Sequence, residues 1–212
     1  MLEPTTPVKH LDLPGHASPA VGFEVPLEML AACHGRVEAQ CATLHRLVGH
    51  LAQHGADRQA QEAASAVMRY FDTSAVHHHA DEEVDLFPAL IEAMAGSDAV
   101  CLRELTASLA AEHRELEQRW RALHRRLEQV AGADVATLPD DDVHDFIDLY
   151  ERHIAREEAE LFPMAARLLS DAELDRIGLA MRARRGALNP THLPIPSLPD
   201  TLRRDPLKEL EA

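Results

Sequence analysis

The sequence predicts an all-α protein: an up-down-up-down four-helix bundle with a short fifth C-terminal helix and flexible tails. Only 9 of the 212 residues are glycine, and the helix-favouring residues alanine, leucine, glutamate and arginine are abundant. Aromatic residues make up 4% of the chain, which argues against a β-sandwich or barrel. Four long helical segments joined by short connections are typical of a bundle.

The chain begins with a segment that has no helical periodicity. Residues 1–25 contain four prolines and read as a flexible N-terminal arm. The first helix is expected over 26–54, because proline is tolerated at the start of a helix and Pro26 stands there. Gly55 is expected to end this helix.

The second helix is expected over about 58–95. Asp57 can cap its N-terminus, and we expect a kink at Pro88 because proline cannot donate to the helical hydrogen-bond ladder. Gly96 and Ser97 then provide a stop and a cap before the next helix.

The third and fourth helices are expected over about 98–131 and 140–169, with the loop 132–139 between them. Asp140 is expected to cap the fourth helix. The pairing of the first two helices with the last two resembles an internal repeat, which would place equivalent side chains around one centre.

The bundle, expected over 26–170, is followed by a shorter helix over 171–186. Ser170 and Glu173 have the spacing of a capping box, which favours a helix start at this point. Residues 187–212 are rich in proline, so we expect an extended or flexible tail.

One eleven-residue pattern occurs twice, at 78–88 and 153–163. Both copies reduce to H-x-x-x-E-E-x-x-L-F-P. Together with the alanine two residues after the histidine, they share seven positions at one fixed spacing. Residues i and i+4 of a helix share a face, so each copy offers one imidazole and one carboxylate from adjacent turns. Two such helices facing one another could enclose a pair of metal ions.

The helical rise of about 1.5 Å per residue predicts which histidines meet. Antiparallel helices meet where residue counts from their shared turn agree, and this places one group of residues in a single layer. The members of this layer are His34, His78, Glu82, His113, His153 and Glu157. A buried polar network without metal is the alternative, but burying six ionisable groups at one level is costly without pairing or a metal.

Three other histidines are close to these candidates in the sequence. His45 shares the inward face with His34 but lies about 16 Å along the helix, so we interpret it as an interior or half-buried residue. His77 is expected to be exposed. His79 lies about 100° round the helix from His78 and is a candidate auxiliary ligand.

The donor set of this layer indicates the metal. Structural zinc sites have four ligands, usually including thiolates, whereas a mixed nitrogen and oxygen set of six suits iron or manganese. Glu82 and Glu157 are well placed to bridge two ions, with the histidines as terminal ligands. Six residues cannot saturate two octahedral ions, so an exogenous oxygen bridge and an open position for a small molecule are expected.

The order His, His-x-x-x-Glu, His, His-x-x-x-Glu, with Leu-Phe-Pro after each carboxylate pair, resembles the hemerythrin-like (HHE cation-binding) domain family over about 26–170. The resemblance implies a four-helix bundle that holds two non-haem iron ions with an oxo or hydroxo bridge. It implies terminal ligands at His34, His78, His113 and His153, and bridges at Glu82 and Glu157. It also implies that Leu86 and Leu161 are apolar lids, which would exclude water.

The sequence departs from the oxygen-carrying hemerythrins in two places. Those carriers have a second histidine four residues along the third helix, where this chain has Glu117, so either His79 or Glu117 could supply a further ligand. Their spacing of the last carboxylate would select Glu158, whereas the repeat selects Glu157, which we prefer. A carboxylate-richer site stabilises ferric iron, so sensing or peroxide handling stands beside reversible oxygen carriage.

We therefore expect a di-iron protein that binds or senses oxygen, redox or iron state, with dioxygen or another small diatomic or peroxide as ligand. The alternative is a di-iron oxidoreductase acting on peroxide or nitric oxide, and the sequence leaves open whether the protein is an enzyme. Any signal would pass through a separate protein partner. A ferritin-like site uses Glu-x-x-His, and no histidine of this chain has glutamate three residues before it.

Composition bounds the partners and the compartment. The formal net charge of −15 argues against binding to nucleic acid or to an anionic membrane surface. No apolar run approaches the length of a membrane span and no signal pattern is present, so we expect the protein in the cytoplasm. We interpret Cys33, Cys41 and Cys101 as small core residues and the arginines of 182–185 as a solvated helix end.

Overall fold

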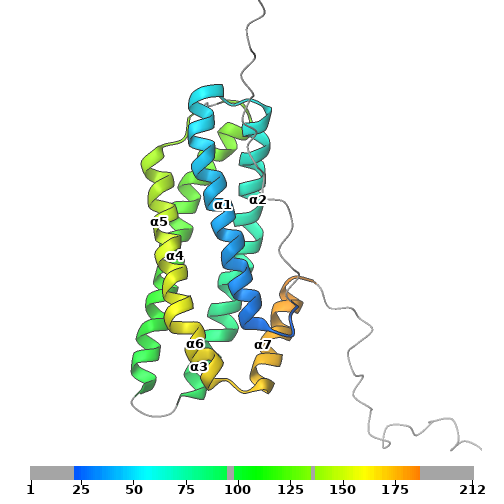
Figure 1. Ribbon diagram of the computed structural model, residues 1–212, viewed down its shortest axis with the longest axis vertical. Helices are drawn as coiled ribbons and strands as arrows, with labels where there is room; N and C mark the ends of the chain where they lie inside the picture. The colour runs from blue at the N-terminus through cyan, green and yellow to red at the C-terminus, as the bar shows by residue number, and fades with distance from the viewer. Residues whose placement is uncertain (1–21, 95–97, 135–136, 187–212) are drawn as a thin grey trace, which may run out of the picture.

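The computed structural model shows an elongated helical bundle (Figure 1). It describes residues 22–94, 98–134 and 137–186. The expected arm over 1–25 lies outside the described residues except for 22–25, and the expected tail over 187–212 lies outside them altogether. The expected stop and cap at Gly96 and Ser97 also fall outside them.

Four long helical rods run up, down, up and down (Figure 1). They begin with the helices α1 (Pro26–His54), α2 (Arg58–Ala80), α4 (Asp98–Ala131) and α5 (Asp140–Arg156). Helix α1 packs against α2 and α5, and α4 packs against the same two helices, so the rods form a closed ring of four. The all-α bundle predicted from the sequence is confirmed.

The two rods that carry the repeated motif change their winding inside the motif. Helix α2 continues through the π-helical segment η1 (Asp81–Leu86) into α3 (Phe87–Ala93), and α5 continues through η2 (Glu157–Leu161) into α6 (Phe162–Leu168). In each rod, the phenylalanine N–H donates to the carbonyl of the glutamate five residues earlier.

The π-helical turns replace the simple kink that the sequence predicted at Pro88. A proline ring would collide with the carbonyl four residues back, and a widened turn just before the proline avoids this collision. Pro88 and Pro163 each occupy the first turn of the α-helix that follows, where their missing N–H costs nothing. The interruption therefore precedes the proline, at the level of Glu82 and Glu157.

Three of the predicted N-terminal caps lie within the described residues, and two of these three are present. The Asp57 carboxylate accepts a hydrogen bond of 2.9 Å from the Ala60 N–H, and Ser170 and Glu173 form a complete capping box at the start of α7 (Asp171–Arg184). The predicted cap at Asp140 is wrong. Asp140 is the first helical residue of α5, and it opens an acidic first turn that suits the positive end of the helix dipole.

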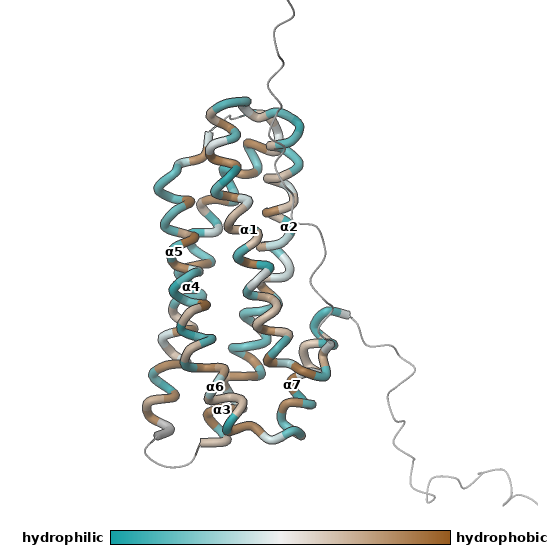
Figure 2. Tube along the Cα trace, viewed as in Figure 1, coloured by the Kyte–Doolittle hydropathy of each residue, from teal (hydrophilic) through white to brown (hydrophobic). Residues whose placement is uncertain are grey.

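The interior consists of two apolar clusters separated by a polar layer. Along α1, Leu30 belongs to the cluster near α7 and Val37 to the cluster near the α1–α2 turn, with His34 between them. Along the second rod, Ala75 belongs to the cluster near the α1–α2 turn and Leu86 to the cluster near α7. Brown segments recur along the inner sides of the rods (Figure 2). The polar layer is thus enclosed by apolar packing above and below.

The three cysteines do not share one environment. Cys33 and Cys41 are buried, as expected, and burial raises the pKa of Cys41 to about 12. Burial also raises the pKa of Cys33, so its thiol stays protonated. The expectation is wrong for Cys101, which is exposed on α4 because the adjacent Leu102 occupies the buried stripe of that helix.

The arginine cluster of α7 is not a solvated helix end, contrary to the sequence interpretation. Arg185 Nη2 lies 2.6 Å from Asp81 Oδ2, and Arg184 contacts both Asp81 and Asp85, with a distance of 2.7 Å to Asp85. The Asp81 side chain has no exposed surface. Helix α7 therefore docks on η1 through a buried carboxylate next to Glu82.

Removal of both arginines should destabilise the protein strongly. We expect Arg184→Ala/Arg185→Ala to lower the free energy of unfolding by about 3–5 kcal/mol, because it leaves the buried Asp81 carboxylate without a partner. Arg182→Ala is the matched control, since Arg182 pairs with the largely exposed Glu24 and should cost less than about 1 kcal/mol. Urea unfolding measures both values. Equal small losses would mean that α7 does not anchor η1.

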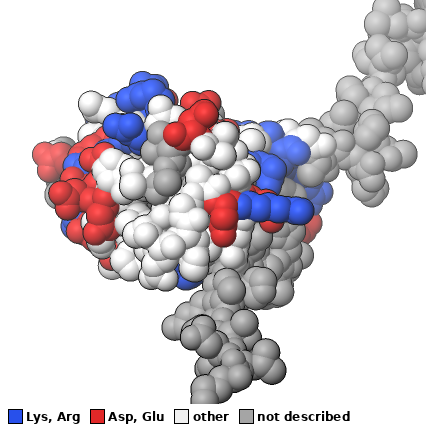
Figure 3. All heavy atoms as spheres, turned by 90° about the horizontal axis from the view of Figure 1, so that it is seen from above, with Lys and Arg blue, Asp and Glu red and all other residues white. Residues whose placement is uncertain are grey.

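The surface of one end of the bundle carries both signs of charge. In the view from above, acidic and basic side chains form separate groups around a mainly uncharged centre (Figure 3). Within the described part of the chain, no helix is long and apolar enough to cross a membrane.

Candidate metal centre

The polar layer brings together the residues that the sequence singled out, one or more from each rod. All of them are buried, with side chains no more than 3% exposed. They are His34 of α1, His78 and Glu82 of the second rod, His113 of α4, and His153 and Glu157 of the fourth rod. The count of residues from each shared turn predicted that these residues lie at one level, and their positions in the structure agree with it.

The two glutamates lie between the imidazoles. The carboxylate of Glu157 has one oxygen 3.1 Å from His34 Nε2 and the other 3.1 Å from His153 Nε2. The carboxylate of Glu82 has its two oxygens 3.4 Å from His78 Nε2 and His113 Nε2. Each carboxylate therefore spans a pair of histidines with both of its oxygens.

These short separations are not ordinary hydrogen bonds. Both carboxylate oxygens of Glu82 and of Glu157 are buried without a hydrogen-bond partner, and so is His34 Nε2. Ligands about 2.1 Å from an ion and at right angles to one another stand about 3.0 Å apart, close to the separations found here. A core of satisfied polar groups would not leave these atoms orphaned. The residues present therefore fit a metal ion.

The donor atoms form two groups that overlap. One group consists of His34, His78, Glu82 and Glu157, and the other of Glu82, His113, His153 and Glu157. Within each group, one donor atom per residue lies within 4.8 Å of every other. Both glutamates belong to both groups, so the arrangement suits two neighbouring ions that share two carboxylates.

The ionisable groups of the layer shift one another's pKa values in different directions. Burial, followed by the negative charge of Glu157, raises the pKa of Glu82 to about 7. Burial acts in the same sense on Glu157, but its contacts with His113, His153 and His34 hold its pKa well below the usual range. Burial and the neighbouring His34 hold the pKa of His78 well below its ordinary value, so this imidazole is neutral and has a lone pair to donate.

The second glutamate of each motif supports a histidine from another rod. Glu83 Oε1 lies 2.8 Å from His113 Nδ1, and Glu158 Oε1 lies 2.9 Å from His34 Nδ1. A carboxylate on Nδ1 sets the tautomer of the imidazole and leaves Nε2 free to bind a metal. Sequence reasoning did not find this role, although the doubled Glu-Glu in both copies was the available signal.

The phenylalanine of each motif covers the face of the same two imidazoles. Phe162 stacks on His34 with ring centroids 5.3 Å apart, and Phe87 stacks on His113 at 6.2 Å. Each motif therefore supplies a carboxylate to the edge and a ring to the face of one histidine in the other half of the bundle. This reciprocal support agrees with the internal repeat, in which the first two helices are equivalent to the last two.

His153 has a different outer partner. Its Nδ1 lies 2.9 Å from an oxygen of Glu112, whose other oxygen contacts Arg156. His78 lacks such a partner, because its Nδ1 is buried without a hydrogen bond. Leu86 and Leu161 are fully buried in the apolar cluster next to the layer.

Loss of an outer carboxylate should weaken metal binding without abolishing it. We expect Glu83→Gln to lower the affinity for metal by about 10–100-fold, because His113 then loses the charged partner that orients it. Glu117→Gln is the control, since Glu117 is exposed on α4 and pairs with Arg121. A competition titration with a chromophoric chelator compares the two. Equal affinities would show that Glu83 does not orient His113.

The two candidates for a further ligand, Glu117 and His79, lie in different surroundings. Glu117 is exposed and pairs with Arg121. His79 stacks on His113 with ring centroids 4.0 Å apart. The neighbouring His77 is half-buried, so the expectation that it is exposed is wrong.

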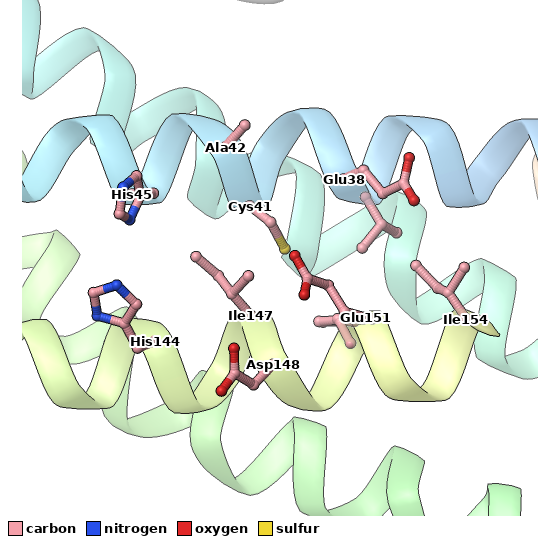
Figure 4. Close-up of a pocket in the computed structure, with 11 residues that line it drawn as sticks. Glu38, Cys41, Ala42, His45, His144, Ile147, Asp148, Glu151 and Ile154 are labelled. Atoms are coloured by element: carbon pink, nitrogen blue, oxygen red, sulfur yellow. The ribbon is translucent and has the colours of Figure 1, made fainter. Parts of the chain in front are cut away.

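His45 is exposed, and its interpretation as an interior or half-buried residue is wrong. It faces His144 across the end of a cavity between α1 and α5, with ring centroids 5.2 Å apart (Figure 4). The cavity has a volume of about 350 Å³. Its lining includes Val37, Cys41 and Ile154, but none of the six residues of the layer.

Comparison with known proteins agrees with this site. A family model of the hemerythrin HHE cation-binding domain matches residues 25–165. An uncharacterised protein of Haemophilus influenzae is 35% identical over 160 residues, which are 76% of this chain and 90% of that protein. The matched range contains every residue of the polar layer, and the chain belongs to the hemerythrin HHE cation-binding domain family.

Proposed function

We propose that this protein holds two non-haem iron ions in the polar layer and uses them to bind or sense oxygen or redox state. The observation that carries the proposal is the pair of overlapping donor groups that share Glu82 and Glu157. Such sharing is what two adjacent ions require. The absence of thiolate from both groups, together with their mixed imidazole and carboxylate donors, favours iron over structural zinc.

In this proposal, His34 and His78 would hold one ion, His113 and His153 would hold the other, and Glu82 and Glu157 would be available to both. An iron pair of this kind would supply reversible electron transfer and an open position for dioxygen or another small ligand. The protein itself would orient the histidine ligands and keep them ready to bind metal. Outer carboxylates at Glu83, Glu158 and Glu112 orient imidazoles, and neutral His78 offers its lone pair without losing a proton.

Access to the layer is restricted by apolar packing. Leu86 and Leu161 have no exposed surface, and Phe162 covers one face of His34. Such apolar packing excludes water from the layer and would admit small uncharged ligands more readily than charged metabolites. This enclosure supports a diatomic or peroxide ligand rather than a larger substrate.

The compartment follows as part of the same proposal. The cysteines of the described residues are free thiols, and the formal net charge is −15, so a reducing cytoplasm suits the chain. A separate protein would carry any signal onward.

Metal content and ligand response test the proposal. Tag-free protein expressed in iron-rich medium should contain close to two irons per chain by mass spectrometry. Reduced protein should then change its near-ultraviolet absorption on exposure to air and recover when re-reduced. One zinc per chain, or no metal, would refute the di-iron proposal.

A turnover assay separates binding or sensing from the oxidoreductase alternative. Peroxide should disappear in the presence of the loaded protein no faster than with free iron at equal concentration. Faster, saturable decomposition that is lost in His78→Ala would instead establish an enzyme that consumes peroxide. The variant His45→Ala, at an exposed position outside the layer, is the control for both measurements.

A further inference from the structure

The π-helical segment η1, which carries Glu82, is held from outside the four rods. Asp81, the residue before Glu82, has no exposed surface, and its carboxylate contacts an arginine pair. This pair consists of Arg184, the last residue of α7, and the adjacent Arg185, which lies 2.6 Å from Asp81. Arg184 also contacts Asp85 at 2.7 Å. The arginine pair therefore links the first residue of η1 to its next-to-last one.

The internal repeat shows why η1 needs a cation from elsewhere. In the second copy of the motif, the residues equivalent to Asp81 and Asp85 are Arg156 and Glu160. Arg156 Nε lies 3.9 Å from Glu160 Oε1, so η2 carries opposite charges at this spacing. Two carboxylates four residues apart repel one another instead. Among the described residues, both aspartates form ion pairs only with the arginine pair, which supplies the positive charge that the second copy contains itself.

Helix α7 is held by packing as well as by charge. It lies beside one end of α1 (Figure 1), and its buried residues Ile177 and Met181 belong to the same apolar cluster as Leu86 of η1. Gly178 approaches the Phe23 carbonyl so closely that a Cβ atom at this position would collide with it. The docked position of α7 is therefore narrowly defined, and a larger residue than glycine at this point would displace the helix.

The winding of η1 connects this anchor to the metal centre. The Phe87 N–H donates to the Glu82 carbonyl, and this bond across five residues defines the widened turn. Loss of the widened turn would rotate the side chains before it relative to those after it. The arginine pair holds both ends of this turn, and the turn holds the Glu82 carboxylate between His78 and His113.

We propose that the arginine pair positions Glu82 for metal binding by holding Asp81. This inference rests on the proposed function, in which Glu82 belongs to both donor groups. Coupling between two equilibria is reciprocal, so bound metal stabilises the docked position of α7 by the same factor by which docking strengthens metal binding. Helix α7 is then the element through which the occupancy of the buried centre reaches the protein surface.

The test disturbs the docking of α7 in two ways. Arg184→Ala/Arg185→Ala removes the charges, and Gly178→Ala displaces the helix while both arginines remain. Arg184→Lys/Arg185→Lys is the conservative variant, which keeps the positive charges but not the planar guanidinium groups.

Two controls separate positioning from general loss of stability. Leu127→Ala destabilises the fold at a fully buried residue of the apolar cluster that excludes α7 and η1. Arg182→Ala removes an α7 arginine that pairs with Glu24 rather than with η1. Circular dichroism identifies a temperature at which every variant is folded, and all measurements use that temperature.

Anaerobic titration with Fe(II) gives the first readout. The double alanine variant and Gly178→Ala should bind iron about 10-fold more weakly than the wild type or weaker still, since couplings between sites typically span about 5–150-fold. The double lysine variant should recover part of this affinity, and both controls should bind normally. Unchanged affinity in the double alanine variant, or an equal loss in Leu127→Ala, would overturn the inference.

Hydrogen exchange of the α7 amides gives a second readout, which a purely structural role of the arginines would not move. In the wild type, the amides of residues 171–184 should exchange more slowly with metal bound than without it. In the double alanine variant, they should exchange faster and independently of metal. Equal exchange in loaded and metal-free wild type would overturn the inference. If the wild type takes up fewer than two irons, the proposed function fails, whereas exchange with and without the ion that it does bind still decides the coupling.

Discussion

Glu157→Gln should lose most of the iron that the wild-type protein binds. The Glu157 carboxylate lies between His34 and His153 and belongs to both overlapping donor groups, so its loss affects both ions at once. An amide has no negative charge and only one oxygen to offer, so it cannot bridge two cations. Iron per chain, measured by mass spectrometry after loading with excess Fe(II), gives the result.

The next residue provides the matched control for this change. Glu158 is 50% exposed and contacts His34 from the outer side, so Glu158→Gln makes the same chemical change outside the layer. At saturating iron it should retain nearly the full metal content. Normal iron in Glu157→Gln with loss in Glu158→Gln would transfer the bridging role to Glu158. Helical content measured on both variants excludes misfolding as the cause.

Removal of the metal should lower thermal stability by a large amount. An ion that binds only the folded chain stabilises it by about 4 kcal/mol when its free concentration is about 1,000 times its dissociation constant. In a protein of this size, each kcal/mol corresponds to about 2–4 °C in Tm. Two ions should therefore raise the Tm by roughly 15–30 °C, as seen by calorimetry before and after chelation.

A variant that cannot bind metal isolates the contribution of the ions. His78→Ala should have nearly the same Tm with and without added iron, because it lacks a terminal ligand. If chelation left the wild-type Tm unchanged, the buried imidazoles and carboxylates would be sufficient partners for one another. The polar layer would then be a structural network rather than a metal centre.

The pattern of residues along the chain is informative about the layer itself. Helical periodicity and rise depend only on local backbone geometry, so a count of residues from each turn is enough to place His34 at the level of His78. The same local rules locate the helix starts at Asp57 and Ser170. One failure is local in origin, since the acidic first turn of α5 serves the purpose that the expected cap at Asp140 would have served.

The outer partners of the histidines could not be derived in this way. Glu83 supports His113 and Glu158 supports His34, and each contact crosses from one rod to another. Which carboxylate reaches which imidazole depends on the rotation of each rod about its axis. The π-helical turns change that rotation within the motif, and helical periodicity alone does not give the size of the change.

The sequence by itself determined the fold class, the family and the level at which six potential ligands meet, because these depend on periodicity and spacing within single helices. Only the tertiary structure decided which side chains of neighbouring helices contact one another. It brought Arg184, the last residue of α7, and the adjacent Arg185 onto buried Asp81. It also stacked the ring of His79, whose Nε2 has no hydrogen-bond partner, on His113. Contacts between helices depend on packing distance and axial rotation, which a linear pattern does not encode.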